Sequence, residues 1–310
     1  MSPQYTKELD GTFDSSMSTT FLKRPTAAVD PPNGRSPSPF TVKHTTDMFR
    51  TKAECTSTSL LGWPTDAFKI DVVDPSAVHT VLIFTPGNPG LVEWYIPFFE
   101  QILQELGPGF ACRGVANAGH SLCHDKVDVA ARDESLRKSK AIPWTVDGQS
   151  LHKCAFVDQV IHEFESKNST RQPSKQIQFI FISHSIGCHF VQRMCVLRPD
   201  ILRRAVRFFH LMPFIRMKAP KGKAMILDAA AAAPNAVIRA HEYLMNGLAS
   251  LPLSAVDALL VNTMNDAKGR QVAAKLLQLP AMARNFFTLG CEEIRDVPEQ
   301  FDVSDYCSTS

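Results

Sequence analysis

The sequence predicts an α/β fold, in which a mostly parallel sheet carries helices on both faces. Two nearly continuous apolar runs, at 77–84 and 178–182, are typical of strands buried on both faces, and a third strand candidate lies at 205–211. Helical patterns alternate with these runs, which indicates parallel strands joined by helices. The chain has 310 residues, 44% of them hydrophobic, and so can bury a sizeable core.

The predicted elements follow one another in a repeated order. The run 77–84 ends in a cluster of turn-forming residues at 85–90. The segment 94–106 then shows the apolar spacing of a helix, and Pro97 suits its first position, where a missing N–H costs nothing. A second helix follows the second run and is expected to stop before Pro199.

The composition of the chain changes along its length. The first part is rich in Ser, Thr, Pro and Lys and cannot bury enough apolar area to offset the entropy lost on ordering. After Pro220 the pattern is helical, with no clear strand, and it includes an apolar segment at 251–261. We therefore expect a flexible extension (1–46), an α/β core (47–219), a helical cap or lipid-facing segment (220–280) and a C-terminal helix and tail (281–310).

Composition excludes several classes of function. The net charge of +2 is too small to bind nucleic acid by electrostatics. Eight cysteines without a C-x-x-C pair describe neither a disulfide framework nor a zinc site, and we expect reduced thiols. No motif indicates a metal or a cofactor. No apolar run reaches the roughly 18 residues of a membrane-spanning helix.

The segment Phe179–Gly187, F-I-F-I-S-H-S-I-G, is the strongest signal for chemistry. A serine between small residues, directly after a buried strand and before a helix, is typical of a nucleophile elbow. Ser185 is the predicted catalytic nucleophile, although Ser183 stands where the usual pattern has glycine. The alternative is that Ser185 only caps the following helix.

An oxyanion hole needs two N–H donors near the nucleophile. The backbone N–H of Ile186, just after the serine, is the first candidate. The second is expected from the loop 85–90, whose two prolines have no N–H. Gly87, Asn88 and Gly90 remain, and Asn88 is favoured. An ordinary rigid turn is the alternative interpretation of this loop.

Two further side chains are candidates for the substrate pocket. His120 follows a weak strand candidate near residue 115, and it either lines the pocket, replaces a missing base or hydrogen-bonds the backbone. Tyr95 belongs to an aromatic group that either forms the floor of an acyl pocket or packs in the core. His184 and His189 adjoin the elbow in sequence but are expected to be structural.

Several motifs occur in order along the chain. They are T-P-G-N-P-G (85–90), A-G-H (118–120), D-G-Q-S-L-H-K (147–153), S-H-S-I-G (183–187), L-M-P-F-I (211–215) and A-P-K-G (219–222). This series resembles the lipid droplet-associated hydrolase family, a branch of the α/β-hydrolases, and the similarity runs from about residue 80 to 289–293. The resemblance implies a serine hydrolase of lipid esters, with sterol esters as the expected substrate. It also implies a place on the phospholipid monolayer of lipid droplets and in the cytoplasm, with the endoplasmic reticulum as a further location.

The chain departs from this family after the elbow. A serine nucleophile needs an acid and then a histidine, in that chain order. Asp228 and His241 follow Ser185 in that order, but both lie in the predicted cap, and no histidine follows the late aspartates 296, 302 and 305. We therefore expect a sheet without its last two strands, in a truncated or naturally short member. Residues 205–211 would then form an open, aggregation-prone edge.

Three functions remain open at this point. The first is the serine esterase. The second is a non-catalytic lipid-droplet protein in which the apolar segments 224–227 and 251–261 insert shallowly into the monolayer, with ordinary cap packing as the alternative. The third is another α/β-hydrolase reaction, such as peptide or thioester cleavage, because a fold does not determine the substrate.

Overall fold

A computed structural model describes residues 52–71, 77–122, 145–166, 176–214 and 234–297 of the chain. The predicted extension 1–46 lies outside these residues, as does the apolar segment 224–227. Asp228, Asp302 and Asp305 also lie outside them.

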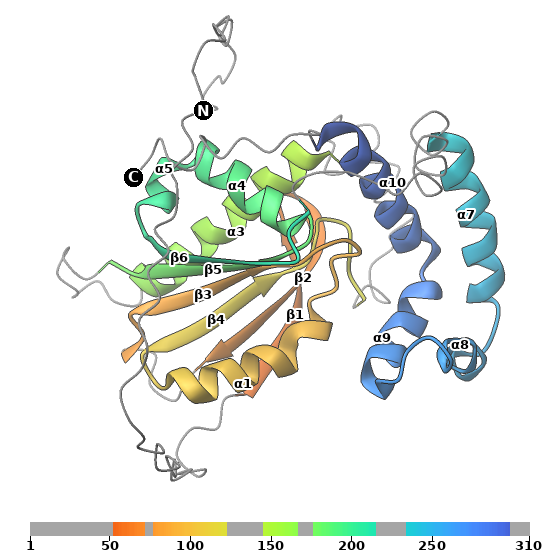
Figure 1. Ribbon diagram of the computed structural model, residues 1–310, viewed down its shortest axis with the longest axis horizontal. Coiled ribbons are helices and arrows are strands. Elements are labelled where there is room, and N and C mark those ends of the chain that lie inside the picture. Colours follow the sequence, from red (N-terminus) through yellow and green to blue (C-terminus); the bar gives the residue numbers. More distant parts are fainter. Residues whose placement is uncertain (1–51, 72–76, 123–144, 167–175, 215–233, 298–310) are drawn as a thin grey trace, which may run out of the picture. The chain divides into compact units, whose positions relative to one another are not determined.

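The described strands form one sheet in the order β1-β2-β4-β3-β5-β6 (Figure 1). They are β1 (Lys52–Leu60), β2 (Trp63–Asp71), β3 (Thr80–Thr85), β4 (Phe110–Val115), β5 (Gln178–His184) and β6 (Ala205–Leu211). The strands β4, β3, β5 and β6 are parallel, while β1 and β2 form an antiparallel hairpin whose second strand pairs with β4. The mostly parallel sheet that the sequence predicts is therefore confirmed.

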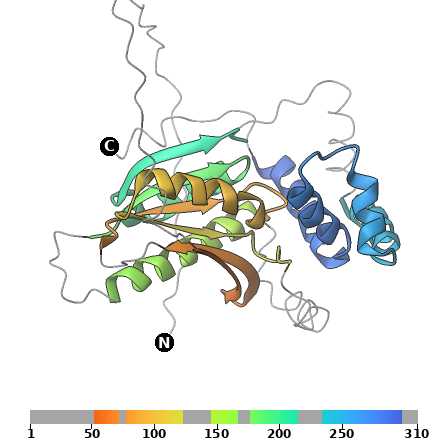
Figure 2. The ribbon, with the colours of Figure 1, turned by 90° about the horizontal axis from the view of Figure 1, so that it is seen from below.

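Helices cover both faces of this sheet (Figures 1 and 2). They are α1 (Ile96–Leu106, after the short 3-10 turn Glu93–Tyr95), α3 (Val146–Ser166), α4 (Gly187–Leu197) and α5 (Pro199–Leu202). Helix α1 packs on one face, and α3 and α4 pack on the other. The predicted helix at 94–106 is confirmed, with Pro97 one position later than expected because α1 begins at Ile96.

After residue 214, every described element is a helix. These are α7 (Pro234–Ala249), α8 (Leu253–Leu260), α9 (Ala267–Leu277) and α10 (Pro280–Asp296). Asp296 is therefore the last residue of α10. Helix α10 contacts the core at the end of the sheet where the parallel strands finish, because Leu289 packs in a buried cluster with Ile186 and Phe190 of the β5–α4 turn and α4.

Strand β3 shows why the apolar run forms a central strand. Its side chains alternate between the two faces: Val81 and Ile83 join the cluster under α3 and α4, and Leu82 and Phe84 join the cluster under α1. All four are at most 1% exposed. Burial on both faces, predicted from the continuous apolar run, is confirmed for this strand.

Strand β6 is the last strand of the sheet within the described residues. Its bounds, Ala205–Leu211, are those predicted from the sequence. The side chains of Val206 and Phe209 are exposed, unlike those of β3. Apolar sequence alone therefore locates this strand but does not determine its burial.

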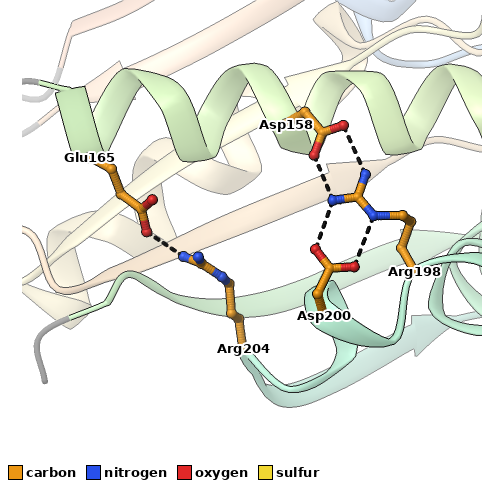
Figure 3. Close-up of polar contacts among 5 residues, drawn as sticks. All are labelled: Asp158, Glu165, Arg198, Asp200 and Arg204. Atoms are coloured by element: carbon orange, nitrogen blue, oxygen red, sulfur yellow. Dashed lines mark hydrogen bonds and ion pairs between the residues drawn. The ribbon is translucent and has the colours of Figure 1, made fainter. Parts of the chain in front are cut away.

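Ion pairs fasten α3 to the segment between α4 and β6 (Figure 3). Arg198 makes a two-pronged contact with Asp158 of α3, at 2.8 and 2.9 Å, and a second with Asp200 of α5. Both carboxylates raise the pKa of Arg198, which keeps it charged. Arg204 pairs with Glu165 of α3 at 2.5 Å. These contacts hold β6 and α4 in place beside β5, which carries the candidate site.

Candidate active site

Ser185 occupies the turn between β5 and α4. Its backbone is in the left-handed region, with φ of +53°, which a residue other than glycine adopts only where the surroundings impose it. The side chain is half-buried, and its hydroxyl makes no hydrogen bond to any described residue. No side-chain hydrogen bond caps α4. The alternative interpretation, that Ser185 is a helix cap, therefore has no support in this geometry.

Gly187 permits the sharp turn after Ser185. A Cβ atom at this position would lie 2.5 Å from the carbonyl oxygens of Thr85 and Pro86, at the end of β3. Because both contacts are with backbone atoms, a side chain here has no room. This close approach of α4 to β3 is the physical reason for a small residue after the serine.

Ser183 takes the place that glycine usually has before the nucleophile. It is fully buried at the end of β5, and its hydroxyl forms a 2.6 Å hydrogen bond with Nδ1 of His210 on β6. Burial lowers the pKa of His210, so the imidazole is neutral. Serine is tolerated at this position because its polar atom has a partner on the neighbouring strand.

The loop after β3 lies directly against Ser185. A Cβ on Gly87 would be 2.8 Å from the Cβ of Ser185. Other segments hold the loop: Asn117 Nδ2 donates to Gly87 O at 3.0 Å, and His120 Nδ1 donates to Pro89 O at 2.5 Å. The loop is therefore braced from the end of β4, as well as being close to the predicted nucleophile.

Backbone donors are available on the two segments that meet at Ser185. Within the described ranges, the N–H groups of Ile186 on one segment and of Gly87 and Asn88 on the other have no hydrogen-bond partner. Backbone N–H groups in folded proteins almost always have a partner, so unpaired donors on two adjoining segments are suited to bind a ligand. The N-terminus of α4 begins at the next residue, and its dipole favours negative charge here.

His184, next to Ser185 in sequence, has a hydrogen-bond partner of its own. Nδ1 of His184 shares a 2.8 Å hydrogen bond with the hydroxyl of Tyr95, whose ring packs 4.4 Å from that of Phe84. Burial lowers the pKa of His184 and raises the pKa of Tyr95 to about 12, so both are neutral. No described histidine hydrogen-bonds Ser185.

His120 is fully buried. Burial is the main cause that lowers its pKa to about 4, and the nearby Lys153 lowers it further. The imidazole is therefore neutral and donates to Pro89 O of the loop. This geometry fits the structural alternative for His120, a brace of the loop. His241, the last histidine in the chain, lies in α7 and packs its ring against that of Phe287.

Helix α10 makes contacts with the site that the sequence analysis did not predict. Asn285 Nδ2 donates to Gly119 O at 2.7 Å, and Asn88 Nδ2 donates to Phe286 O at 3.0 Å. Leu289 packs against Ile186. These partners lie about two hundred residues from the loop in sequence, and no local pattern could have indicated them.

Metal-binding clusters and membrane-spanning helices can both be assessed over the described residues. Within the described ranges, no three His, Cys, Asp or Glu side chains are placed to hold a metal ion. In the same residues, no single helix is long and apolar enough to cross a membrane. The bent pair 238–249 and 253–260, at 117°, meets that length and composition test only when the two helices are taken together.

The sheet order and the elbow after β5 give the chain an α/β-hydrolase-like fold. Among solved structures, the haloalkane dehalogenase DatA of Agrobacterium tumefaciens aligns over 83% of this chain and 72% of its own, with a TM-score of 0.47 and 13% identity. A brefeldin A esterase aligns over 55% of this chain and 42% of its own, with a TM-score of 0.36 and 12% identity.

The sequence relatives, unlike the solved structures, all carry the name of one family. The chain is 31% identical to the lipid droplet-associated hydrolase of Homo sapiens over 148 residues, which are 46% of this chain and 41% of that protein. It is 26% identical to the Gallus gallus protein of the same name over 147 residues, 47% of this chain and 40% of that one. The match thus spans less than half of each relative. The sequence model of the lipid-droplet associated hydrolase family matches residues 78–308, and the chain belongs to that family.

Proposed function

We propose that this protein is a serine hydrolase of lipid esters, sterol esters among them, and that Ser185 is its nucleophile. The observation that carries the proposal is the juxtaposition at the elbow. Within the described residues, a hydroxyl without a hydrogen-bond partner, on a residue with φ of +53°, adjoins a loop and a helix start that carry unpaired backbone N–H groups. The relatives that carry the name lipid droplet-associated hydrolase support the same reaction class.

The proposed reaction follows from these groups. Ser185 Oγ attacks the ester carbonyl carbon, its proton passes to a base, and the carbonyl oxygen becomes negative. The N–H groups of Ile186 and Asn88 then donate to that oxygen, as the α4 dipole also favours. The alcohol leaves with a proton, and water afterwards cleaves the ester between the acyl group and Ser185.

Within the described residues, no histidine is hydrogen-bonded to Ser185, so the structure does not assign the base that accepts the proton. The family resemblance implies an acid and a histidine after the elbow, and the chain offers no described pair that fits. In serine hydrolases that have lost triad members, the oxyanion hole and substrate binding still accelerate acyl transfer. The proposal therefore rests on the nucleophile and the donors.

A fluorophosphonate probe tests the proposal, because it reacts only with an activated serine. We expect wild type to be labelled and Ser185→Ala to lose that labelling. Ser250→Ala is the matched control, since Ser250 is exposed and its hydroxyl donates to Gly247 O in its own turn. Wild-type labelling no stronger than that of Ser185→Ala would contradict the hydrolase proposal.

A second candidate function is a non-catalytic protein of the lipid-droplet surface. The observation that favours it is a set of exposed large apolar side chains on α7 and α8 and next to them. These are Tyr243, Leu244, Leu251, Leu253, Leu259 and Val261. Exposed apolar side chains on adjacent helices suit shallow insertion into a phospholipid monolayer. Both functions place the protein at the droplet.

Exposed leucines allow a direct test of droplet binding. Leu244 and Leu259 are 59% and 62% exposed, so serine at either position leaves the core intact. If each leucine inserts into the monolayer, each substitution removes about 1 kcal/mol of transfer free energy, or roughly fivefold in binding to droplets. Leu151→Ser, at a 53% exposed leucine on α3, is the matched control. Flotation with phospholipid-coated oil droplets measures the effect, and equal binding by all variants would contradict insertion through α7 and α8.

A further inference from the structure

Helix α10 presents a carboxyl group, that of Glu293, beside the loop that carries the Asn88 donor. We propose that Glu293 acts as a neutral carboxylic acid that donates a hydrogen bond to Asn88 Oδ1, and is thereby a positioning residue for the oxyanion loop. This inference rests on the proposed hydrolase function and adds a residue that the sequence analysis did not assign to the site.

The first support is the geometry of α10 against the loop. Asn88 Nδ2 donates to Phe286 O at 3.0 Å, and a Cβ on Gly290 would lie 3.6 Å from the same nitrogen. Positions 286, 290 and 293 are related as i, i+4 and i+7, so they share one face of the helix. The Asn88 side chain therefore lies along the face of α10 on which Glu293 stands.

The second support is a pair of polar atoms without partners. Asn88 Oδ1 and Glu293 Oε1 are both inaccessible to solvent, and neither has a hydrogen bond to any described residue. Leaving buried polar atoms unsatisfied costs about 1–3 kcal/mol each. Asn88 Oδ1 can only accept, so a proton on Glu293 is what allows the two groups to satisfy each other.

The protonation state fits this role. Burial raises the pKa of Glu293 to about 8, and the Asn88 amide partly offsets that rise. Near neutral pH the carboxyl group therefore holds its proton and is able to donate. Above about pH 8 the group is a buried carboxylate, which has no proton left to donate to Asn88 Oδ1.

Charged and titratable groups on the elements around α10 do not explain the shift. None of them is a cause of the pKa change of Glu293, whose causes are burial and Asn88. Three ion pairs occupy charged groups on the helices: Glu242 with Arg284, Asp147 with Arg193, and Asp257 with Arg270. The ring of His241 packs on that of Phe287. The remaining groups form hydrogen bonds: His152 with Thr65, Lys153 with Ala116, His120 with Pro89, and His184 with Tyr95.

The test compares two substitutions at one position. Glu293→Gln keeps a donor at every pH, whereas Glu293→Met keeps the volume but cannot donate. The measurement is the rate of fluorophosphonate labelling of Ser185 as a function of pH, expressed relative to wild type so that effects common to all variants cancel. Glu292→Gln, one residue earlier on the same helix, is the matched control.

We expect Glu293→Gln to react like wild type near pH 7 and about tenfold faster than wild type near pH 9.5, where the native carboxyl is ionised. Glu293→Met is expected to react about fivefold to tenfold more slowly than wild type near pH 7. The inference is overturned if Glu293→Gln shows the same alkaline decline as wild type, or if Glu293→Met matches wild type at neutral pH.

Thermal unfolding separates this inference from the proposed function. The folded state holds the Glu293 proton up to about pH 8, whereas the unfolded chain releases it near the usual value of 4.5. The stability of wild type relative to Glu293→Gln therefore falls as pH rises through that window and is level above it. If no labelling occurs but this decline is seen, the hydrolase proposal fails while the protonated state of Glu293, on which this inference depends, stands. A stability difference that is independent of pH overturns the contact itself.

Discussion

Gly187→Ala is expected to destabilise the fold by about 2–4 kcal/mol and to abolish labelling of Ser185. The added Cβ would lie 2.5 Å from the carbonyl oxygens of both Thr85 and Pro86. Because both are backbone atoms at the end of a central strand, the steric clash is removed only if β3 and α4 move apart. Such overpacking costs more when no flexible side chain is able to yield. That movement also separates Ser185 from the loop that bears Asn88.

The same substitution elsewhere provides the control. Gly247 lies within helix α7, and a Cβ at that position meets nothing within 4 Å. Gly247→Ala is expected to be neutral or to stabilise the protein by about 0.5–1 kcal/mol, because alanine has the higher helix propensity. Urea denaturation measures both variants. Equal stability of the two would show that α4 does not approach β3 as closely as the structure indicates.

Arg113→Ala is expected to cost about 3–5 kcal/mol. The Arg113 side chain on β4 is 5% exposed and forms ion pairs with Asp71 at 2.5 Å and Glu163 at 2.9 Å. It also donates to Cys112 O and lies 5.0 Å from the centre of the Phe164 ring. Alanine removes this packing and leaves two partly buried carboxylates without their partner. The network that Arg113 forms joins β2, β4 and α3. We therefore expect its loss to lower the stability of the whole sheet, with unfolding still cooperative.

A surface ion pair on the same sheet is the comparison for Arg113. Lys69 pairs with Glu54 at 2.9 Å between β2 and β1, but the two side chains are 43% and 50% exposed. Lys69→Ala is expected to cost less than about 1 kcal/mol because water screens the pair. A loss of stability for Arg113→Ala as small as that for Lys69→Ala would contradict the account of this buried network.

The sequence predicted those elements whose pattern reflects burial directly. Strand β3 and strand β5 were found because their apolar runs face helices on both sides. Strand β1 was missed because it is largely exposed and polar. Strand β2 was missed because its buried residues include the polar Thr65 and Asp66, which interrupt the apolar pattern. Apolar periodicity reports contact with a core, and a strand with little such contact gives little signal.

Helix α3 was missed for a different reason. It buries Gln149, His152 and Lys153, which interrupt its apolar spacing. Their partners come from distant segments: Gln149 bonds Ala118, His152 bonds Thr65, and Lys153 donates to Ala116 O. Burial without charged partners lowers the pKa of Lys153 well below its usual value. Tertiary hydrogen bonds thus allow a polar sequence to face the core, which local patterns do not reveal.

The candidate site also has parts that the sequence predicts and parts that it does not. The serine, its small neighbours and the loop were predictable because a sharp turn constrains residue types locally. Glu293 was not predictable, since its contact with Asn88 depends on how α10 meets the loop across about two hundred residues. The reaction also needs a base, and no described histidine is hydrogen-bonded to Ser185.

Trapping the acyl-enzyme tests the central claim most directly. The protein is mixed with an activated fatty-acyl ester, quenched with acid, and digested for peptide mapping by mass spectrometry. The account predicts an acyl group on Ser185 in wild type, retained in Ser250→Ala and missing in Ser185→Ala. Turnover of the ester with the acyl group on another residue, or with no acyl-enzyme and undiminished activity in Ser185→Ala, would contradict it.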